Sequence, residues 1–144
     1  MFIINNDITY AVATKVLAIR QICPQGESKE AIVCKIKEVF PEEPEVMIAI
    51  AIAESKLNNE AIGYNCYYEG KSKACKPEDR AKAWSVDCYV MQQNFPNRKT
   101  CPQMTLNEHL KDVRAMYDKR GLSPWCTYKD KLHLKYLPEA KSMI

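Results

Sequence analysis

The sequence predicts a mainly α-helical fold, a single compact domain over residues 1 to 144 with one irregular, disulfide-containing excursion. Apolar residues recur at helical spacing in most segments, and capping residues or prolines stand at the segment boundaries. The composition, 47% hydrophobic with only 4 glycines, is that of a packed domain. A chain of this length can bury roughly two thirds of its unfolded surface, so one core is sufficient.

Two amphipathic helices are expected at the start of the chain. Residues 7 to 22 carry apolar side chains at helical spacing behind Asp7, a plausible N-cap, and the sequence CPQGE ends this segment. Ser28 is a second cap candidate, and the apolar residues that follow it predict a helix to about Val39. The sequence FPEEP terminates that helix because the residue before a proline avoids helical backbone angles.

The third helix, residues 44 to 57, is expected to be the central, buried one. Pro44 can occupy its first position, where the missing N–H is not needed. Isoleucine, valine, methionine and alanine surround this helix on all sides, so it has no solvated face.

The second half of the chain combines an irregular segment with further helices. Residues 58 to 80 are rich in Asn, Gly, Tyr, Lys and Cys without any period, which predicts a disulfide-closed excursion with little strand. A helix then follows Thr105, which forms a capping box with Glu108, and Gly121 can take the left-handed cap. The leucines of the tail indicate a last short helix with Pro138 near its end.

Seven cysteines pose a choice between a metal site and disulfides. No pair has the C-x-x-C spacing of zinc ribbons, so we expect no metal site, and the sequence calls for no cofactor. Disulfides in an oxidising compartment would close modest loops and restrict the unfolded chain by roughly 3 kcal/mol each. Connectivity cannot be deduced from spacing alone, and the pairs of suitable spacing are Cys66/Cys75, Cys88/Cys101 and Cys23/Cys34, which leave Cys126 over.

Charge and hydropathy narrow the range of partners. A net charge of +3 spread along the chain is far from the basic stripe of a dedicated nucleic-acid-binding protein, so no nucleic acid is expected. No stretch approaches the roughly 20 apolar residues of a membrane span. The N-terminal segment does not have the pattern of a signal peptide, yet oxidised cysteines favour an extracytoplasmic location, periplasmic or secreted.

An acidic residue follows the apolar run of the third helix. An ionised carboxylate in apolar surroundings loses much of its hydration free energy, so Glu54 is expected to resist ionisation. A Glu with a raised pKa keeps its proton near neutral pH and can act as a general acid toward a poor leaving group. The alternative is that the helix reaches the surface at Glu54, and that Ser55 and Lys56 begin a solvated end.

Three motifs in order bear on this choice. The stretch AESKLNNEA resembles, from Glu54 onward, the E-S-x-x-N-x-x-A signature of the lysozyme-like superfamily, especially soluble lytic transglycosylases and the specialised transglycosylases of secretion systems. The stretch SVDCYVMQQN resembles the second motif of that superfamily, usually G-L-M-Q-I-N. KTCP, YDKRGLSPW and Tyr128 resemble the third region, where members carry a tyrosine near the cleft. The resemblance covers about residues 43 to 128.

The resemblance implies a mostly helical, α+β lysozyme-like fold whose cleft cuts the β-1,4 bond between N-acetylmuramic acid and N-acetylglucosamine in peptidoglycan. Glu54 would protonate the glycosidic oxygen. In transglycosylases the same carboxylate then takes a proton from the sugar's own C6 hydroxyl to close an anhydro ring, whereas in lysozymes water completes the reaction. The implied partners are peptidoglycan glycan strands, with a secretion or phage tail apparatus as a further candidate.

Asp87 bears on the choice between these two chemistries. In animal-type lysozymes the second carboxylate stands just ahead of the equivalent of CYVMQQN, and Asp87 occupies that place. If Asp87 faces the cleft, one protonated acid and one ionised carboxylate would work as a pair. The alternative is a loop Asp that bonds nearby backbone amides.

The resemblance also implies substrate contacts for Ser55, Met91, Gln92, Asn94 and Tyr128. The serine hydroxyl would position the acid or touch substrate, the two amides would bind N-acetyl or hydroxyl groups, and the methionine would form an apolar cleft wall. The tyrosine phenol would hold the acid or the sugar. Each residue also has a structural alternative. The serine would be an ordinary helix-end residue, the amides would support the loop, and the methionine would fill the core. The tyrosine, together with Trp125, would cover the core.

Two residues depart from the family pattern. Tyr89 stands where the second motif has Gly, so a shifted loop or a narrowed cleft is expected, and Gln93 replaces an apolar residue. These departures motivate a second hypothesis, a glycan-binding or structural module of the same fold that has lost turnover. His109 and His133 have no partner spacing, so surface or core roles are expected for both.

Overall fold

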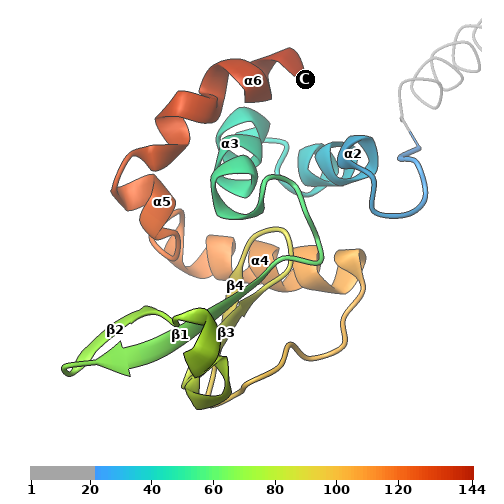
Figure 1. Ribbon diagram of the computed structural model, residues 1–144. Coiled ribbons are helices and arrows are strands. Elements are labelled where there is room, and N and C mark those ends of the chain that lie inside the picture. Colours follow the sequence, from blue (N-terminus) through green and yellow to red (C-terminus); the bar gives the residue numbers. More distant parts are fainter. Residues whose placement is uncertain (1–21) are drawn as a thin grey trace, which may run out of the picture.

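The computed structural model describes residues 22 to 144 and has a helical part and a sheet part (Figure 1). The helix expected over residues 7 to 22 and its cap at Asp7 lie, but for the last residue, outside the described range. Within this range no helix is long and apolar enough to cross a membrane.

The first two described helices agree with the sequence. Helix α2 spans Lys29–Val39, and the Ser28 hydroxyl caps it by accepting a hydrogen bond from the Ala31 N–H at 3.1 Å. Helix α3 spans Pro44–Ser55, and every residue from 47 to 52 is buried, which confirms its central position. It ends two residues earlier than predicted because Lys56 and Leu57 have positive φ angles of 57° and 60°.

The C-terminal helices follow in the order α4 (Leu106–Arg120), α5 (Cys126–Lys129), the 3-10 helix η2 (Leu132–Tyr136) and α6 (Leu137–Ser142). Thr105 caps α4 as predicted, since its hydroxyl accepts from the Glu108 N–H at 3.1 Å. Pro138 lies at the start of α6 and not near its end, because a proline in the first turn leaves no N–H unsatisfied.

The prediction of a mainly α-helical fold is wrong, because residues 22 to 144 have an α+β fold with a four-stranded antiparallel sheet. The strands are β1 (Ile62–Tyr68), β2 (Lys71–Ala74), β3 (Ser85–Cys88) and β4 (Gln93–Pro96), in the spatial order β2-β1-β3-β4. A short 3-10 helix, η1 (Pro77–Lys82), connects β2 to β3. The segment expected to contain little strand therefore holds β1 and β2.

Two physical signals for this hairpin lie in residues 58 to 80. Glu69 and Gly70 join β1 to β2 with positive φ angles of 52° and 76°, the backbone that a two-residue hairpin turn requires. Strand β1 also contains three tyrosines, a residue type that strands favour. The hydrophobic alternation that would have indicated a strand is missing, because β1 and β2 have no row of buried apolar residues.

The hydrophobic core lies in the helical part, around α3. Helices α2 and α6 and the 3-10 helix η2 contact α3, and α4 runs between the helical part and the sheet (Figure 1). The largest fully buried side chains belong mainly to these helices and to the turn before β4, and they include Phe40, Ile32, Ile36, Met47, Ile48, Ile50, Met91, Leu110 and Val113. Glu54, near the end of α3, is therefore carried by the most deeply buried helix of the described residues.

The three suitable cysteine pairs are all confirmed as disulfides. Cys23–Cys34 joins the segment before α2 to that helix, Cys66–Cys75 joins β1 to the segment after β2, and Cys88–Cys101 joins the end of β3 to the loop before α4. Cys126 has a free, exposed thiol.

Candidate functional site

Glu54 is the second-to-last residue of α3 and points into a cleft rather than into a solvated helix end. Its side chain is half-buried, and its Oε1 accepts a hydrogen bond of 2.8 Å from the Thr127 hydroxyl. Burial raises the pKa of Glu54 above its ordinary value, the Thr127 hydrogen bond opposes this by lowering it, and the charge of Asp87 raises it further.

The cleft has a volume of about 490 Å³ and lies between the helical part and the sheet. Four of the seven predicted site residues line it, namely Glu54, Asp87, Gln92 and Asn94. The rest of the lining comes from β1, β2, the residue before β3, α4 and the segment that leads into α5, with Asn65, Ser72, Trp84, Met116, Arg120, Pro124, Trp125 and Cys126. The acid and the sheet therefore face the same space.

Asp87 is held by side chains of the sheet and does not cap a loop. It lies on β3 between Gly63 of β1 and Asn94 of β4. Its Oδ2 accepts from Asn65 Nδ2 at 3.0 Å, and its Oδ1 accepts from Asn94 Nδ2 at 2.8 Å. Both amides also donate to the buried Ser85 hydroxyl, so the two carboxylate oxygens are oriented by a connected polar network.

Gln92 lines the cleft while its amide group is tied to the backbone. Its Nε2 donates to the carbonyl oxygens of Ala61 at 3.0 Å and Tyr89 at 2.8 Å. Its Oε1 would lie 3.2 Å from a Cβ added at Gly63, so a side chain at that position of β1 would crowd it. Gln92 can therefore offer a ligand its oxygen as an acceptor, while its two amide hydrogens bond to the turn and to the residue before β1.

Three residues that were predicted to contact substrate do not line the cleft. The Ser55 hydroxyl donates to the carbonyl oxygens of Val90 at 2.7 Å and Ala51 at 3.1 Å, which joins α3 to the turn after β3. Met91 is fully buried in the core and does not form a cleft wall. The ring of Tyr128 packs against His133 with 4.8 Å between centroids.

Thr127 holds the acid, in place of the neighbouring tyrosine phenol. Sequence reasoning missed Thr127, although the third motif placed the correct segment beside the cleft. The His133 ring contacts this segment, since its Nδ1 lies 3.3 Å from the Thr127 carbonyl oxygen. His133 is buried, as expected for a core histidine.

Tyr89, which stands at the glycine position of the resembled motif, has a backbone conformation that usually requires glycine. Its φ angle is 68°, in the left-handed region that favours glycine. Its phenol points away from the cleft, donates to the Pro102 carbonyl oxygen and accepts from the Met104 N–H at 2.9 Å. Tyr89 therefore anchors the loop before α4, and it is not among the residues that line the cleft.

Gln93 and the buried His109 form a hydrogen bond with each other. The Met91 N–H donates to His109 Nε2 at 3.1 Å, so the proton of the neutral ring is on Nδ1 and donates to Gln93 Oε1 at 3.2 Å. Burial lowers the pKa of His109 to about 4, while nearby Asp112 opposes this shift. The polar residue in the second motif thus satisfies a buried histidine, which is a core residue as expected.

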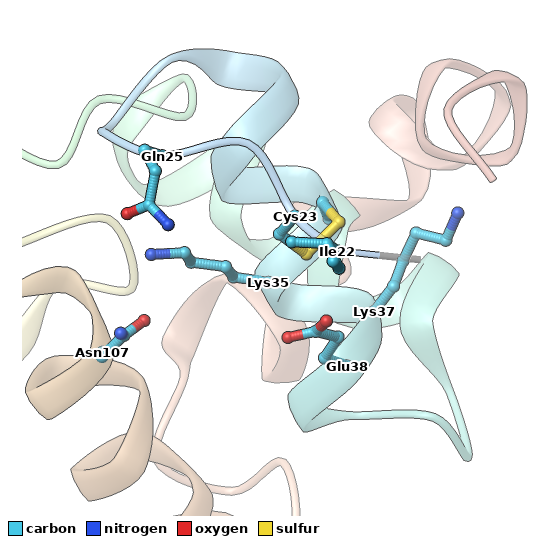
Figure 2. Close-up of a pocket in the computed structure, with 8 residues that line it drawn as sticks. Ile22, Cys23, Gln25, Lys35, Lys37, Glu38 and Asn107 are labelled. Carbon is cyan, nitrogen blue, oxygen red and sulfur yellow. A yellow bond between two sulfur atoms is a disulfide. The ribbon is translucent and has the colours of Figure 1, made fainter. Parts of the chain in front are cut away.

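A second hollow of about 670 Å³ lies beside α2 and contains none of the predicted site residues (Figure 2). Lys35 and Glu38 of α2 extend into it from one side, and Asn107 of α4 lies opposite (Figure 2). The Cys23 and Cys34 sulfurs lie within 4.8 Å of the Glu38 carboxylate, but the disulfide removes the thiolates that a metal would require. The Glu54 cleft is therefore the better candidate site.

Comparison with known proteins gives no assignment, since no family model, no curated protein and no solved structure matches the chain significantly. A function must therefore be argued from the cleft and from the sequence motifs.

Proposed function

We propose that this protein cleaves the β-1,4 bond between N-acetylmuramic acid and N-acetylglucosamine in peptidoglycan, with Glu54 as the general acid. The observation that supports this best is a half-buried carboxyl with a raised pKa that shares a cleft with a second, hydrogen-bonded carboxylate. A carboxyl with a raised pKa holds its proton to higher pH, which suits it to protonating a poor leaving group, and glycosidase sites commonly pair such an acid with an ionised partner.

In the first step, Glu54 donates its proton to the glycosidic oxygen. The bond between that oxygen and the anomeric carbon breaks, both electrons go to the oxygen, and the sugar ring is left with oxocarbenium character. Glu54 is then a carboxylate, and the Thr127 hydroxyl at 2.8 Å stabilises its new charge. The Asp87 carboxylate, which two amide groups hold in place, stabilises the positive charge on the sugar.

Two second steps are compatible with this start. In the transglycosylase route, which the sequence motifs favour, the Glu54 carboxylate takes a proton from the C6 hydroxyl, whose oxygen then bonds to the anomeric carbon and closes an anhydro ring. In the hydrolytic route, the Glu54 carboxylate takes a proton from a water molecule, whose oxygen then bonds to the anomeric carbon. The position of Asp87 in the cleft favours the hydrolytic route as a second candidate, because a second carboxylate can support the charged sugar until water arrives.

An extracytoplasmic location is part of this proposal. Three disulfides form within the described residues, and such bonds persist in oxidising compartments such as the periplasm or the extracellular space. Peptidoglycan lies in the same compartment, where a secretion or phage tail apparatus would be a further candidate partner.

The decisive experiment measures soluble muropeptides released from purified cell wall. The wild type should release them, and Glu54→Gln should lower the rate at least ~100-fold, because a neutral amide cannot donate a proton to the leaving group. Glu45→Gln is the matched control, since Glu45 is an exposed residue of the same helix and should retain full activity. Equal release by the wild type and Glu54→Gln would contradict the proposal.

The products separate the remaining alternatives. An anhydro-muramyl end is lighter by one water than a hydrolysed end, so product mass distinguishes the two second steps. A wild type that binds glycan and releases nothing would identify the binding module that the departures at Tyr89 and Gln93 suggested.

A further inference from the structure

Two aromatic rings stack on each other at the sheet side of the cleft. Trp84, which immediately precedes β3, lines the cleft and is half-buried. Tyr67 of β1 is 60% exposed. Their ring centroids are 5.2 Å apart, with 23° between the ring planes. Trp84 and Tyr67 together form an aromatic platform.

The orientation of the indole is fixed without any ligand. Trp84 Nε1 donates to the Ser72 hydroxyl of β2 at 2.9 Å. The Trp84 N–H donates to the Asn65 carbonyl oxygen at 2.9 Å, and its own carbonyl oxygen accepts from the Asn97 N–H at 2.7 Å. A ring that is already ordered loses little conformational entropy when a ligand binds, so this arrangement favours binding.

The platform lies on the same face of the sheet as Asp87. Gly63 pairs with Asp87, and Tyr67 pairs with Ser72. Every second residue of a strand points to the same face of the sheet, so positions 63, 65 and 67 of β1 share one face. Tyr67 lies four residue steps beyond Gly63 along the strand, or about 13 Å. This distance exceeds the length of one sugar ring, so the platform lies beyond any sugar held between Glu54 and Asp87.

The fold does not use this platform as core. Neither of its two residues belongs to the buried hydrophobic cluster around α3. The other tryptophan, Trp125, shows the contrast, because it is only 3% exposed and donates its indole N–H to the Met91 carbonyl oxygen. A large, oriented aromatic surface that remains open beside a polar cleft is a feature of ligand sites.

We propose that the aromatic platform is a subsite for one sugar ring of a β-1,4-linked, N-acetylated glycan, outside the sugars at the bond that is cut. The C–H face of the sugar would stack on the indole of Trp84, with Tyr67 supporting the indole from behind. Ser72 retains its hydroxyl hydrogen as a donor, and Asn65 retains Oδ1 as an acceptor, for the polar rim of that sugar. The proposal takes its ligand class from the proposed function and adds the place of binding.

The first test measures binding of a soluble hexamer of β-1,4-linked N-acetylglucosamine by calorimetry, in the Glu54→Gln background so that no cleavage occurs. Trp84→Ala should weaken the affinity about tenfold, a typical loss for a stacked aromatic contact. Trp84→Phe is the matched variant, because it retains an aromatic face on Tyr67 and should stay within about threefold of the parent. A Trp84→Ala affinity within twofold of the parent overturns the subsite, as does a parent that does not bind the hexamer.

A second measurement needs no substitution at the platform and so does not depend on how Trp84→Ala folds. The NMR signal of the Trp84 indole N–H reports directly on the platform. Saturating hexamer should shift this signal. An unmoved Trp84 signal at saturation overturns the subsite.

Failure of the subsite and failure of the proposed function have different signatures. Glu54-dependent wall cleavage with unaltered hexamer binding in Trp84→Ala rejects the subsite alone. Trp84-dependent binding by a wild type that releases no muropeptides rejects the enzyme alone. If both proposals hold, Trp84→Ala should raise KM for cell wall with little change in kcat, because the platform does not touch the bond that is cut.

Discussion

At the scale of single residues, the pKa of Glu54 is set by opposing influences. Burial and the charge of Asp87 raise its pKa, whereas the Thr127 hydroxyl stabilises the ionised form and lowers it. The hydrogen bond therefore opposes the upward shift that burial and the charge of Asp87 produce. Thr127 thus sets the pH range in which Glu54 carries a proton.

Replacing Thr127 should move this range. Thr127→Val removes the one influence within the described residues that lowers the pKa of Glu54, so the pKa should rise further. The alkaline limb of the pH profile for muropeptide release, where Glu54 loses its proton, should move to higher pH. Thr127→Ser retains the hydroxyl and should leave the limb in place. Identical limbs in the valine and serine variants would show that the hydroxyl does not tune the acid.

At the scale of elements, the turn between β3 and β4 joins the two parts of the molecule. Its backbone contacts side chains from three helical segments, namely Ser55 of α3, His109 of α4 and Trp125 before α5. These contacts stabilise a turn in which Tyr89 and Gln92 hold positive φ angles of 68° and 50°. The turn can therefore present Gln92 to the cleft in one fixed geometry.

His109 should make the stability of this connection depend on pH. The folded state holds the ring neutral with a pKa of about 4, compared with 6.5 in the unfolded chain. Between these values the unfolded chain binds a proton that the folded protein does not, so stability is lost as pH falls. Urea unfolding at pH 7 and at pH 4.5 should give a loss about 2 kcal/mol larger for the wild type than for His109→Gln. Glutamine can also accept and donate but does not titrate, and equal losses in the two proteins would reject this role.

The elements also show what the sequence could predict. Helices α2, α3 and α4 follow from local signals, because Ser28, Pro44 and Thr105 start them and apolar periodicity continues them. The sheet was missed because β1 and β2 carry polar and aromatic side chains toward the cleft and the solvent, which removes the alternation of a strand with one buried face. The Glu69–Gly70 turn was the remaining signal for a hairpin.

The site was predictable to the extent that its residues belong to contiguous motifs. Glu54, Asp87, Gln92 and Asn94 meet in one cleft, as the motifs suggested. Met91 and Ser55 belong to the same motifs but serve packing and the link between helix and turn. Thr127 could not be chosen over its neighbour, because which of two adjacent side chains faces α3 depends on how α5 packs.

At the scale of the whole molecule, three disulfides are distributed over both parts of the fold. Their cysteines are separated by 11, 9 and 13 residues, so each bond closes a short loop. Loops of this size contribute roughly 3 kcal/mol each in the chain-entropy model. Their sum of about 9 kcal/mol is comparable to the total stability of a typical domain, about 5 to 15 kcal/mol.

Reduction should therefore unfold much of the protein at moderate temperature. Thermal unfolding followed by circular dichroism should show a cooperative transition for the oxidised protein and a loss of at least ~20 °C in Tm, or no transition, after full reduction. Mass spectrometry of alkylated thiols gives the control that all three bonds were opened. A fully reduced protein that melts within ~5 °C of the oxidised one would show that packing alone maintains the fold.

Cys126 gives the molecule a built-in attachment point. Six of the seven cysteines are tied up in pairs, so a maleimide reagent applied without reductant marks this position alone. The marked sulfur sits on the rim of the cleft, one residue from the threonine that holds the acid. A fluorophore or spin probe placed there would report the binding of a ligand in the cleft, in a chain whose sequence has not been altered.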